Sequence, residues 1–158
     1  MYYIVQFGGG KMELKKILVV LLLAFFLCSL QVEANTKTDA YLLAKIICGE
    51  AQTETFHGKL AVGTVVLNRV EDFRFPDTIE EVIYAPNQFT VTKQEKWKNI
   101  EPDKDSWRAA RKILNGYRSF RSSILFYYNP KIATDKKFVE SVEPILTIRN
   151  HIFAQHKK

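Results

Sequence analysis

The chain has 158 residues, a formal net charge of +6, 47% apolar residues and 13% aromatic residues. This apolar and aromatic content excludes a disordered chain, and the length suits one ordinary domain in addition to a targeting segment. The basic charge favours anionic partners such as cell-wall polymers, membrane surfaces or nucleic acid, without choosing among them.

The N-terminal segment has the features of a secretory signal. Lys15 and Lys16 form a basic region, residues 17–30 form an apolar region, and residues 32–34 end in a small alanine suited to cleavage. The apolar run is shorter than the roughly 20 residues of a comfortable membrane span. We therefore expect export, with no stable membrane insertion after cleavage.

This signal sets the expected domain organisation. Residues 1–34 are expected to be the signal peptide, with Met12 as the true start because it directly precedes the basic region. Residues 35–158 are then expected to form a single domain. Cys48 is the one cysteine of that domain, so no intramolecular disulfide can form within it.

The first helix of the domain carries a carboxyl group at the edge of its apolar face. Residues 36–39 have the spacing of a capping box, which predicts the start of this helix. With about 100° per residue, Glu50 lies roughly 80° from the centre of the apolar stripe. Glu50 is therefore expected to be half covered. The stripe consists of Leu43, Ala44, Ile47 and Ala51.

The next segment is apolar on nearly all sides. Residues 58–70 therefore predict a central buried helix, in which Gly63 permits a neighbouring helix to approach closely. Asn68 and Arg69 interrupt the apolar run near its end.

Two shorter helices are predicted after it. Residues 77–80 repeat a capping signature before a short helix through Tyr84, and a loop follows over residues 85–94. Residues 105–116 predict an amphipathic helix that stops at Gly116. Its expected inward residues are Trp107, Ala110, Ile113 and Leu114.

The C-terminal third changes character. Residues 122–130 and 144–154 are rich in branched and aromatic residues and are bounded by prolines, which predicts strands. The polar residues 131–143 between them are expected to form a loop. The predicted fold class is α+β, with a helical core and a small antiparallel sheet toward the C-terminus.

Glu50 is the leading catalytic candidate. Apolar surroundings disfavour the charged carboxylate, so the pKa of Glu50 should rise and let it donate a proton in glycosidic cleavage. The structural alternative is a carboxylate that reaches water from the edge of the stripe. A second catalytic carboxylate would have to come from Glu54, Asp72 or Asp77, each of which could equally be a helix cap or a solvated charge.

Cys48 and His151 make a competing constellation, that of a cell-wall cysteine endopeptidase or amidase. However, Cys48 lies deep within its helix, away from the N-terminal turn that would lower a thiol pKa, and is more easily read as a small buried hydrophobe. The histidines His57, His151 and His156 lack the spacing of a tight ligand pair. We therefore expect no metal and no cofactor.

Sugar-binding grooves use flat apolar faces and amide groups, and the chain offers both. Gln88 and Phe89 on a loop, and Tyr128 and Asn129 at a strand end before a proline, are the expected substrate-binding residues. Trp107 fits the core face of its helix and is expected to be structural.

Several motifs, in order, resemble the cell-wall hydrolases of the spore-cortex-lytic enzyme type (SleB and CwlJ). They are "LLAKIICGEAQTETFHGKLAVGTVVLNRV", "FPDTIEEVIYAPNQFT", "FYYNP" and "IRNHIF", and the resemblance runs from about Tyr41 to Phe153. It implies a lysozyme-like or lytic-transglycosylase-like fold. The last motif adds Asn150 and His151 to the expected substrate-binding residues.

The resemblance also implies an activity, which is cleavage of the MurNAc–GlcNAc bond in the glycan strand of spore cortex or cell wall. Glu50 matches the family's helix-borne acid/base, and a lytic transglycosylase would need no second carboxylate. The family usually has alanine at Gly49, and glycine at Asn87 and Arg149, so this chain departs from the pattern there.

The sequence therefore predicts a secreted peptidoglycan hydrolase that acts on glycan strands in the cell wall or spore cortex and does not bind nucleic acid. Two alternatives stay open. One is the Cys48/His151 endopeptidase or amidase, and the other is a non-catalytic basic module that binds the wall.

Overall fold

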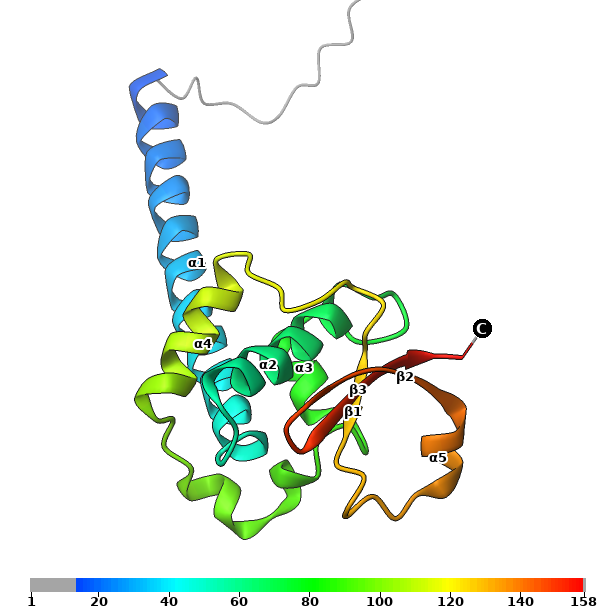
Figure 1. The fold of residues 1–158 in the computed structure, drawn as a ribbon. Helices are drawn as coiled ribbons and strands as arrows, with labels where there is room; N and C mark the ends of the chain where they lie inside the picture. Colours follow the sequence, from blue (N-terminus) through cyan, green and yellow to red (C-terminus); the bar gives the residue numbers. More distant parts are fainter. Residues whose placement is uncertain (1–13, 158) are drawn as a thin grey trace, which may run out of the picture. The chain divides into compact units, whose positions relative to one another are not determined.

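The computed structural model describes residues 14–157, apart from the side chains of residues 14–15 and 28–35. The chain divides into two compact units, residues 1–36 and 37–158. The predicted start at Met12 lies outside the described residues. Helix α1 (Leu14–Glu50) contributes to both units (Figure 1).

The first unit, where described, is helical, and its apolar side chains are exposed, for example Leu18 at 59% and Phe25 at 77%. In the part of the chain that the structure describes, no helix has a stretch long and apolar enough to cross a membrane. The prediction that the first helix starts at residues 36–39 is wrong for the full chain, because the helix already begins at Leu14. Residues 17–30 contain strong helix formers and neither proline nor glycine, so nothing stops the helix there.

The second unit is built on the end of α1 and three further helices, α2 (Phe56–Val70), α3 (Ile79–Tyr84) and α4 (Lys104–Leu114). These confirm the three predicted helices that follow the first. Side chains of Thr55, Thr78 and Asp103 cap them by accepting backbone N–H groups of the first turn. The core between them is apolar and includes Leu43, Ile47, Val66, Ile83, Ala110 and Ile113.

Close approach of these helices depends on Gly63 of α2. A Cβ atom at this position would lie 2.5 Å from Ile113 Cδ1 and 2.7 Å from Ile47 Cδ1, well inside normal contact distance. Both isoleucines are fully buried. The glycine therefore lets side chains of α1 and α4 pack directly against the backbone of α2.

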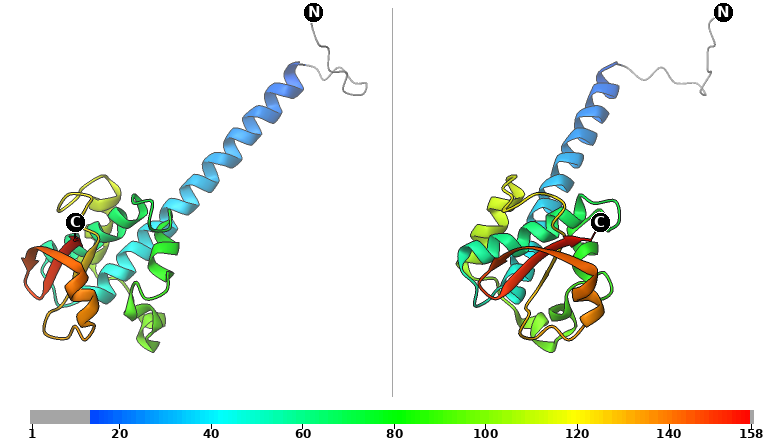
Figure 2. Two further views of the ribbon diagram at one scale, coloured as in Figure 1. Left: turned by 90° about the vertical axis from the view of Figure 1, so that its right-hand side faces the viewer. Right: turned by 45° about the vertical axis from the view of Figure 1, so that its right-hand side comes forward.

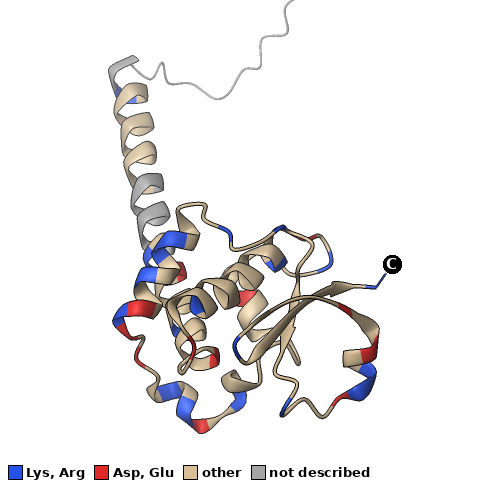
Figure 3. Ribbon diagram, in the orientation of Figure 1, with Lys and Arg blue, Asp and Glu red and all other residues tan. Residues whose placement is uncertain are grey.

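The segment between α3 and α4 contains two short 3₁₀-helices, η1 (Thr90–Lys93) and η2 (Glu95–Asn99), where the sequence predicted a loop up to residue 94. The side chains of Val91 and Trp97 are buried and anchor this segment to the helical core. Lys and Arg residues are spread over α4, this segment and α5 (Lys136–Ser141), as Figure 3 shows.

The C-terminal sheet has three antiparallel strands in the order β1-β3-β2. They are β1 (Phe126–Tyr128), β2 (Val142–Ile148) and β3 (His151–His156). The single strand predicted over residues 144–154 is a hairpin, in which Arg149 takes a positive φ of 48° at the turn. The predicted loop over residues 131–143 contains α5, capped by the side chain of Asp135.

The sheet lies against α2 and closes a second part of the core (Figures 1 and 2). Fully buried Phe153 of β3 packs with Val62 and Val65 of α2 and with Ile124, just before β1. In the sheet register Tyr127 faces Phe153. This packing brings β1 and the start of β3 close to the end of α1.

Candidate active site

Glu50 is the last residue of α1, where the helix ends against η1. A Cβ atom at the preceding Gly49 would lie only 3.1 Å from Val91 Cγ2, so glycine allows η1 to approach the helix end closely. The backbone N–H of Val91 donates a hydrogen bond to the Glu50 carboxyl group. Glu50 itself is half-buried, as the sequence predicted.

Tyr127 on β1 reaches Glu50 from the sheet. Its hydroxyl donates a hydrogen bond to Glu50 Oε2 at 3.0 Å. The tyrosine ring packs against the rings of His151 and Phe153, with centroids 5.2 Å and 5.8 Å away. Burial, together with the nearby charge of Glu50, raises the pKa of Tyr127 well above its usual value, so the hydroxyl keeps its proton and stays a donor.

Arg69, near the end of α2, supplies a buried cation beside this pair. Its Nε donates to the backbone carbonyl of Leu125 at 2.8 Å, and only 5% of the residue is exposed. The guanidinium lies 5.0 Å from the ring centroid of Phe89 and 5.9 Å from that of Phe126. Burial lowers the pKa of Arg69 to about 10, opposed by electrostatic interactions with Tyr127 and Glu50, so the group remains a cation at neutral pH.

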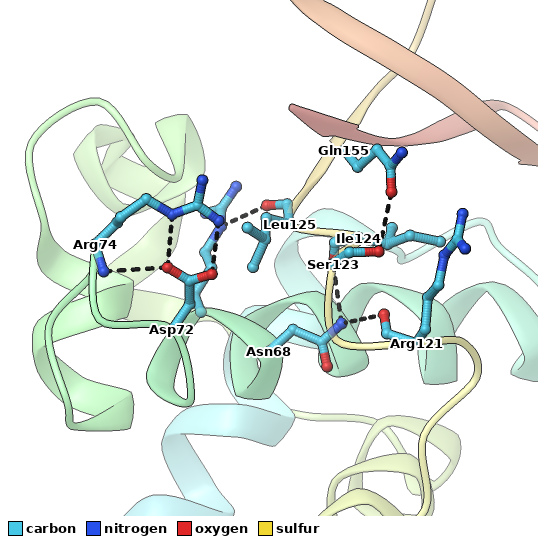
Figure 4. Close-up of polar contacts among 9 residues, drawn as sticks. Asn68, Asp72, Arg74, Arg121, Ser123, Ile124, Leu125 and Gln155 are labelled. Atoms are coloured by element: carbon cyan, nitrogen blue, oxygen red, sulfur yellow. Dashed lines mark hydrogen bonds and ion pairs between the residues drawn. The ribbon is translucent and has the colours of Figure 1, made fainter. Parts of the chain in front are cut away.

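The neighbouring Asn68 holds the segment that leads into β1. Its side-chain amide donates to the carbonyl oxygens of Arg121 at 3.0 Å and Ile124 at 2.9 Å (Figure 4). With the Arg69 bond to Leu125, the end of α2 thereby binds three backbone carbonyls of this segment. These bonds fix the position of β1, and with it Tyr127, relative to the helices.

These surroundings shift the acidity of Glu50. Burial raises its pKa above the ordinary value, and this effect exceeds the opposing ones. The hydrogen bonds from Tyr127 and Val91, followed by the charges of Lys96 and Arg69, favour the ionised form and lower the pKa. Glu50 is therefore set up to hold a proton and, once it has donated that proton, to be stabilised as a carboxylate.

Glu50 lines a cleft with a volume of about 220 Å³. Of the substrate-binding residues expected from the sequence, four lie in this cleft with Glu50: Gln88, Tyr128, Asn129 and His151. The cleft is also lined by Arg69, Thr90, Tyr127 and Ile132. Polar amides beside an aromatic face are the groups that bind sugars.

The other two expected substrate-binding residues lie elsewhere. Phe89 is 2% exposed and packs in the helical core beneath Arg69, so its ring does not face the cleft as expected. Burial of the apolar ring is favourable, and the ring makes a cation–π contact with the Arg69 guanidinium instead. Asn150 lies at the hairpin turn, where its Nδ2 donates to Glu54 Oε1 at 2.9 Å.

None of the three candidate partner carboxylates lines the cleft. Glu54 is buried in the turn that follows α1 and pairs with Asn150. Asp72 makes two hydrogen bonds to the Arg74 guanidinium, at 2.8 Å and 2.7 Å, which lower the pKa of the Asp72 carboxyl group. Asp77 is exposed ahead of α3. Among the described residues, Glu50 is the only carboxyl group in the cleft lining.

Cys48 lines a different cavity, of about 430 Å³, formed with residues of η2 and the following loop. Its Sγ lies 3.7 Å from the carbonyl oxygen of Glu101 and 3.9 Å from Asp103 Oδ2. His151 instead lines the Glu50 cleft. The structure thus does not bring together the thiol and the imidazole that a cysteine peptidase requires.

Sequence reasoning missed two residues of the site, Tyr127 and Arg69. Tyr127 belongs to a run of aromatic residues in which its neighbours were preferred, although it pairs in the sheet with the buried Phe153. The sequence indicates Arg69 only as an interruption of an apolar helix. A cation within such a helix was itself a signal, because a buried charge needs a counter-charge or a polar partner nearby.

Two curated proteins are similar to this chain in sequence. The spore cortex-lytic enzyme of Oceanobacillus iheyensis is 34% identical over 124 residues, which is 78% of this chain and 44% of the relative. The cell wall hydrolase CwlJ of Bacillus subtilis is 33% identical over 102 residues, which is 61% of this chain and 70% of that relative. The chain therefore spans less than half the length of the spore cortex-lytic enzyme.

A solved structure is similar in fold over about three quarters of this chain. The catalytic domain of the germination-specific lytic transglycosylase SleB from Bacillus anthracis superposes with a TM-score of 0.67 at 32% identity, covering 74% of this chain and 93% of that domain. The mostly helical core with a small C-terminal antiparallel sheet is thus the fold of that domain. The cell wall hydrolase family matches residues 53–154, and the chain belongs to that family.

Proposed function

We propose that this protein is a lytic transglycosylase that cleaves the MurNAc–GlcNAc bond of peptidoglycan glycan strands, with Glu50 as both acid and base. The observation that carries the proposal is the cleft itself. It holds one carboxyl group, whose pKa is raised by burial and which is hydrogen-bonded by Tyr127. The similarity to the SleB catalytic domain supports the same reaction.

The reaction needs one group that first gives and then takes a proton. Protonated Glu50 donates its proton to the glycosidic oxygen as the bond to the anomeric carbon breaks. The resulting carboxylate then removes the proton from the C6 hydroxyl of the muramic residue. That oxygen bonds to the anomeric carbon and closes an anhydro ring, so no water is consumed and Glu50 ends protonated again.

The surroundings of Glu50 suit both stages. Burial favours the protonated form that is needed before cleavage. Afterwards the Tyr127 hydroxyl, the Val91 amide and the cations Arg69 and Lys96 stabilise the carboxylate. A muramidase that uses water would instead need a second carboxylate near the cleft, and Glu54, Asp72 and Asp77 do not line it.

The substrate source and the export of the protein are part of this proposal. The relatives named as spore cortex-lytic enzymes support spore cortex as the substrate. The basic and apolar segment at residues 15–30 supports export after removal of residues 1–34. A cut at this place would leave α1 to begin close to the capping box at residues 36–39.

Mass spectrometry of the soluble products tests the reaction. Secreted protein, whose intact mass should fix its first residue as Asn35, is incubated with purified cortex and with vegetative sacculi. We expect anhydro-muramic ends from cortex, and a loss of at least about 10³-fold in product for Glu50→Gln, which keeps the size of the side chain but cannot transfer the proton. Reducing muramic ends would show hydrolysis instead. Release of new amino groups that stops when the Cys48 thiol is alkylated would favour the endopeptidase or amidase alternative.

A further inference from the structure

The carboxyl group of Glu54, one turn beyond Glu50, has no role in the reaction above. It is nevertheless buried, with 8% of the residue exposed. Gly58 makes room for it, because a Cβ atom there would lie 2.8 Å from Glu54 Cβ and 3.1 Å from Glu54 Oε2. A buried carboxylate is costly unless it is paired, so its partners indicate what it does.

Glu54 faces the hairpin turn between β2 and β3. Its Oε1 accepts a hydrogen bond from Asn150 Nδ2 at 2.9 Å and lies 3.7 Å from Nδ1 of His151. Arg149 Nη1 donates to the carbonyl oxygen of Thr53 at 3.4 Å. Arg149 and Asn150 of the hairpin thus contact Thr53 and Glu54 after α1. These contacts hold Glu54 beside His151.

His151 lies between this carboxylate and the cleft. Its Nδ1 is buried, makes no hydrogen bond, and lies 3.7 Å from Glu54 Oε1, while the ring lines the cleft with Glu50. The ring also packs edge-to-face on Tyr127, 5.2 Å between centroids. Since Nδ1 is turned inward, Nε2 is the nitrogen left to face the cleft.

A carboxylate beside Nδ1 selects one form of a neutral imidazole. With the carboxylate 3.7 Å from Nδ1, electrostatics favours the form that has the proton on Nδ1, toward Glu54, and the lone pair on Nε2. Burial lowers the pKa of His151, which keeps the ring neutral at neutral pH although the charge of Glu54 opposes this shift. The cleft therefore contains a hydrogen-bond acceptor of fixed direction.

A fixed acceptor discriminates among the groups of a glycan strand. Sugar hydroxyls can donate or accept and adapt to either tautomer, whereas the N–H of an acetamido group can only donate. We propose that Glu54 is a positioning residue that holds His151 as the acceptor for an acetamido N–H of the substrate. This inference rests on the proposed function, because it assigns a contact of the same cleft.

Glu54→Leu gives a sharp test. Leucine fills most of the same buried space but offers no oxygen beside Nδ1, so the neutral imidazole should take the opposite tautomer, with the proton on Nε2. NMR of ¹⁵N-labelled histidine should show Nδ1 protonated in the unaltered chain and Nε2 protonated in the variant. An Nδ1 that stays protonated in the variant would refute the positioning role of Glu54.

Binding of two soluble probes then tests recognition. A tetramer of N-acetylglucosamine carries an acetamido group on each ring, and cellotetraose has a hydroxyl at the same place. We expect Glu54→Leu to weaken binding of the first about five- to tenfold, the effect of one misplaced hydrogen bond, and to leave the second unchanged. Equal loss for both probes, or none for either, would overturn the proposal.

A second variant tests the same contact independently, in case the first does not fold. His151→Phe keeps an aromatic ring against Tyr127 but has no acceptor, so it should lose the preference for the acetamido probe. A retained preference would show that His151 does not bind the acetamido N–H. The products formed from sacculi decide the proposed function separately, because tautomer and probe binding do not depend on which ends are released.

Discussion

The helices and the sheet act on the same carboxyl group in different ways. On the helical side the contacts are apolar and close, as where Ile47 and Ile113 pack on Gly63. On the sheet side they are polar and reach Glu50 through Tyr127. The helical side therefore fixes the position of Glu50 and contributes to its burial, and the sheet adds the hydrogen bond from Tyr127 that lowers its pKa.

The largest effect on stability should come from the helical side. Gly63→Val would place new methyl groups where Ile113 Cδ1 and Ile47 Cδ1 already lie. We expect the free energy of unfolding to fall by about 2 kcal/mol, measured by urea denaturation with an unchanged slope. Adding Ile113→Val removes the nearest methyl group and should restore part of the loss. If the two changes are strictly additive, the close approach at Gly63 does not limit packing.

A change on the sheet side should alter acidity with little effect on folding. Tyr127→Phe removes a hydrogen bond that lowers the pKa of Glu50, so that pKa should rise further. The acid is active when protonated, and activity is lost as the pH rises through its pKa. The alkaline limb of the kcat/KM profile should therefore move to higher pH. Maximal activity should fall about tenfold, because the carboxylate of the second stage loses a donor.

The matched control for that profile is a tyrosine of the same strand. Tyr128→Phe also removes a hydroxyl from a tyrosine that lines the cleft, but Tyr128 is not among the groups that shift the pKa of Glu50. Its alkaline limb should stay in place. A limb that moves equally in both variants would mean that the profile does not report the proton of Glu50.

The smallest effect should be at Gly49, on the helical side directly before Glu50. Gly49→Ala adds a Cβ 3.1 Å from Val91 Cγ2 and 3.2 Å from Ile100 Cδ1, which is tight but met by side-chain ends. A gain in helix propensity of up to about 1 kcal/mol opposes this crowding. We expect a net change below about 0.5 kcal/mol in urea unfolding and less than about threefold in kcat/KM. A larger loss of activity would show that the Val91 contact with Glu50 is sensitive to small shifts.

The helical side was largely predictable because its signals are local. The apolar run of α2 and the amphipathic pattern of α4 lie within single segments, and the half-buried position of Glu50 follows from the α1 stripe. The capping box misled about the start of α1, because a good cap does not end a helix that already continues through it.

The sheet side was less predictable because its key contacts join distant residues. Tyr127 and Glu50 are 77 positions apart, and no periodicity connects them. The turn at Arg149 was read as part of a strand, since asparagine and arginine there gave a weaker turn signal than glycine would. The sequence places Phe89 in the cleft because it is an aromatic residue beside Gln88 on a loop. Neighbouring residues on a loop can point in opposite directions, and only packing decides that Phe89 is the buried one.

The bonds from the end of α2 to residues 121–125 have a consequence for when the protein becomes active. They anchor a segment that lies after all four helices of the core in the chain, and Tyr127 and His151 follow it. Until that last third has docked, Glu50 lacks the hydrogen bond from Tyr127, and the cleft lacks Tyr128, Asn129 and His151. We therefore expect the proposed activity to arise only when the C-terminal sheet has folded onto the helices.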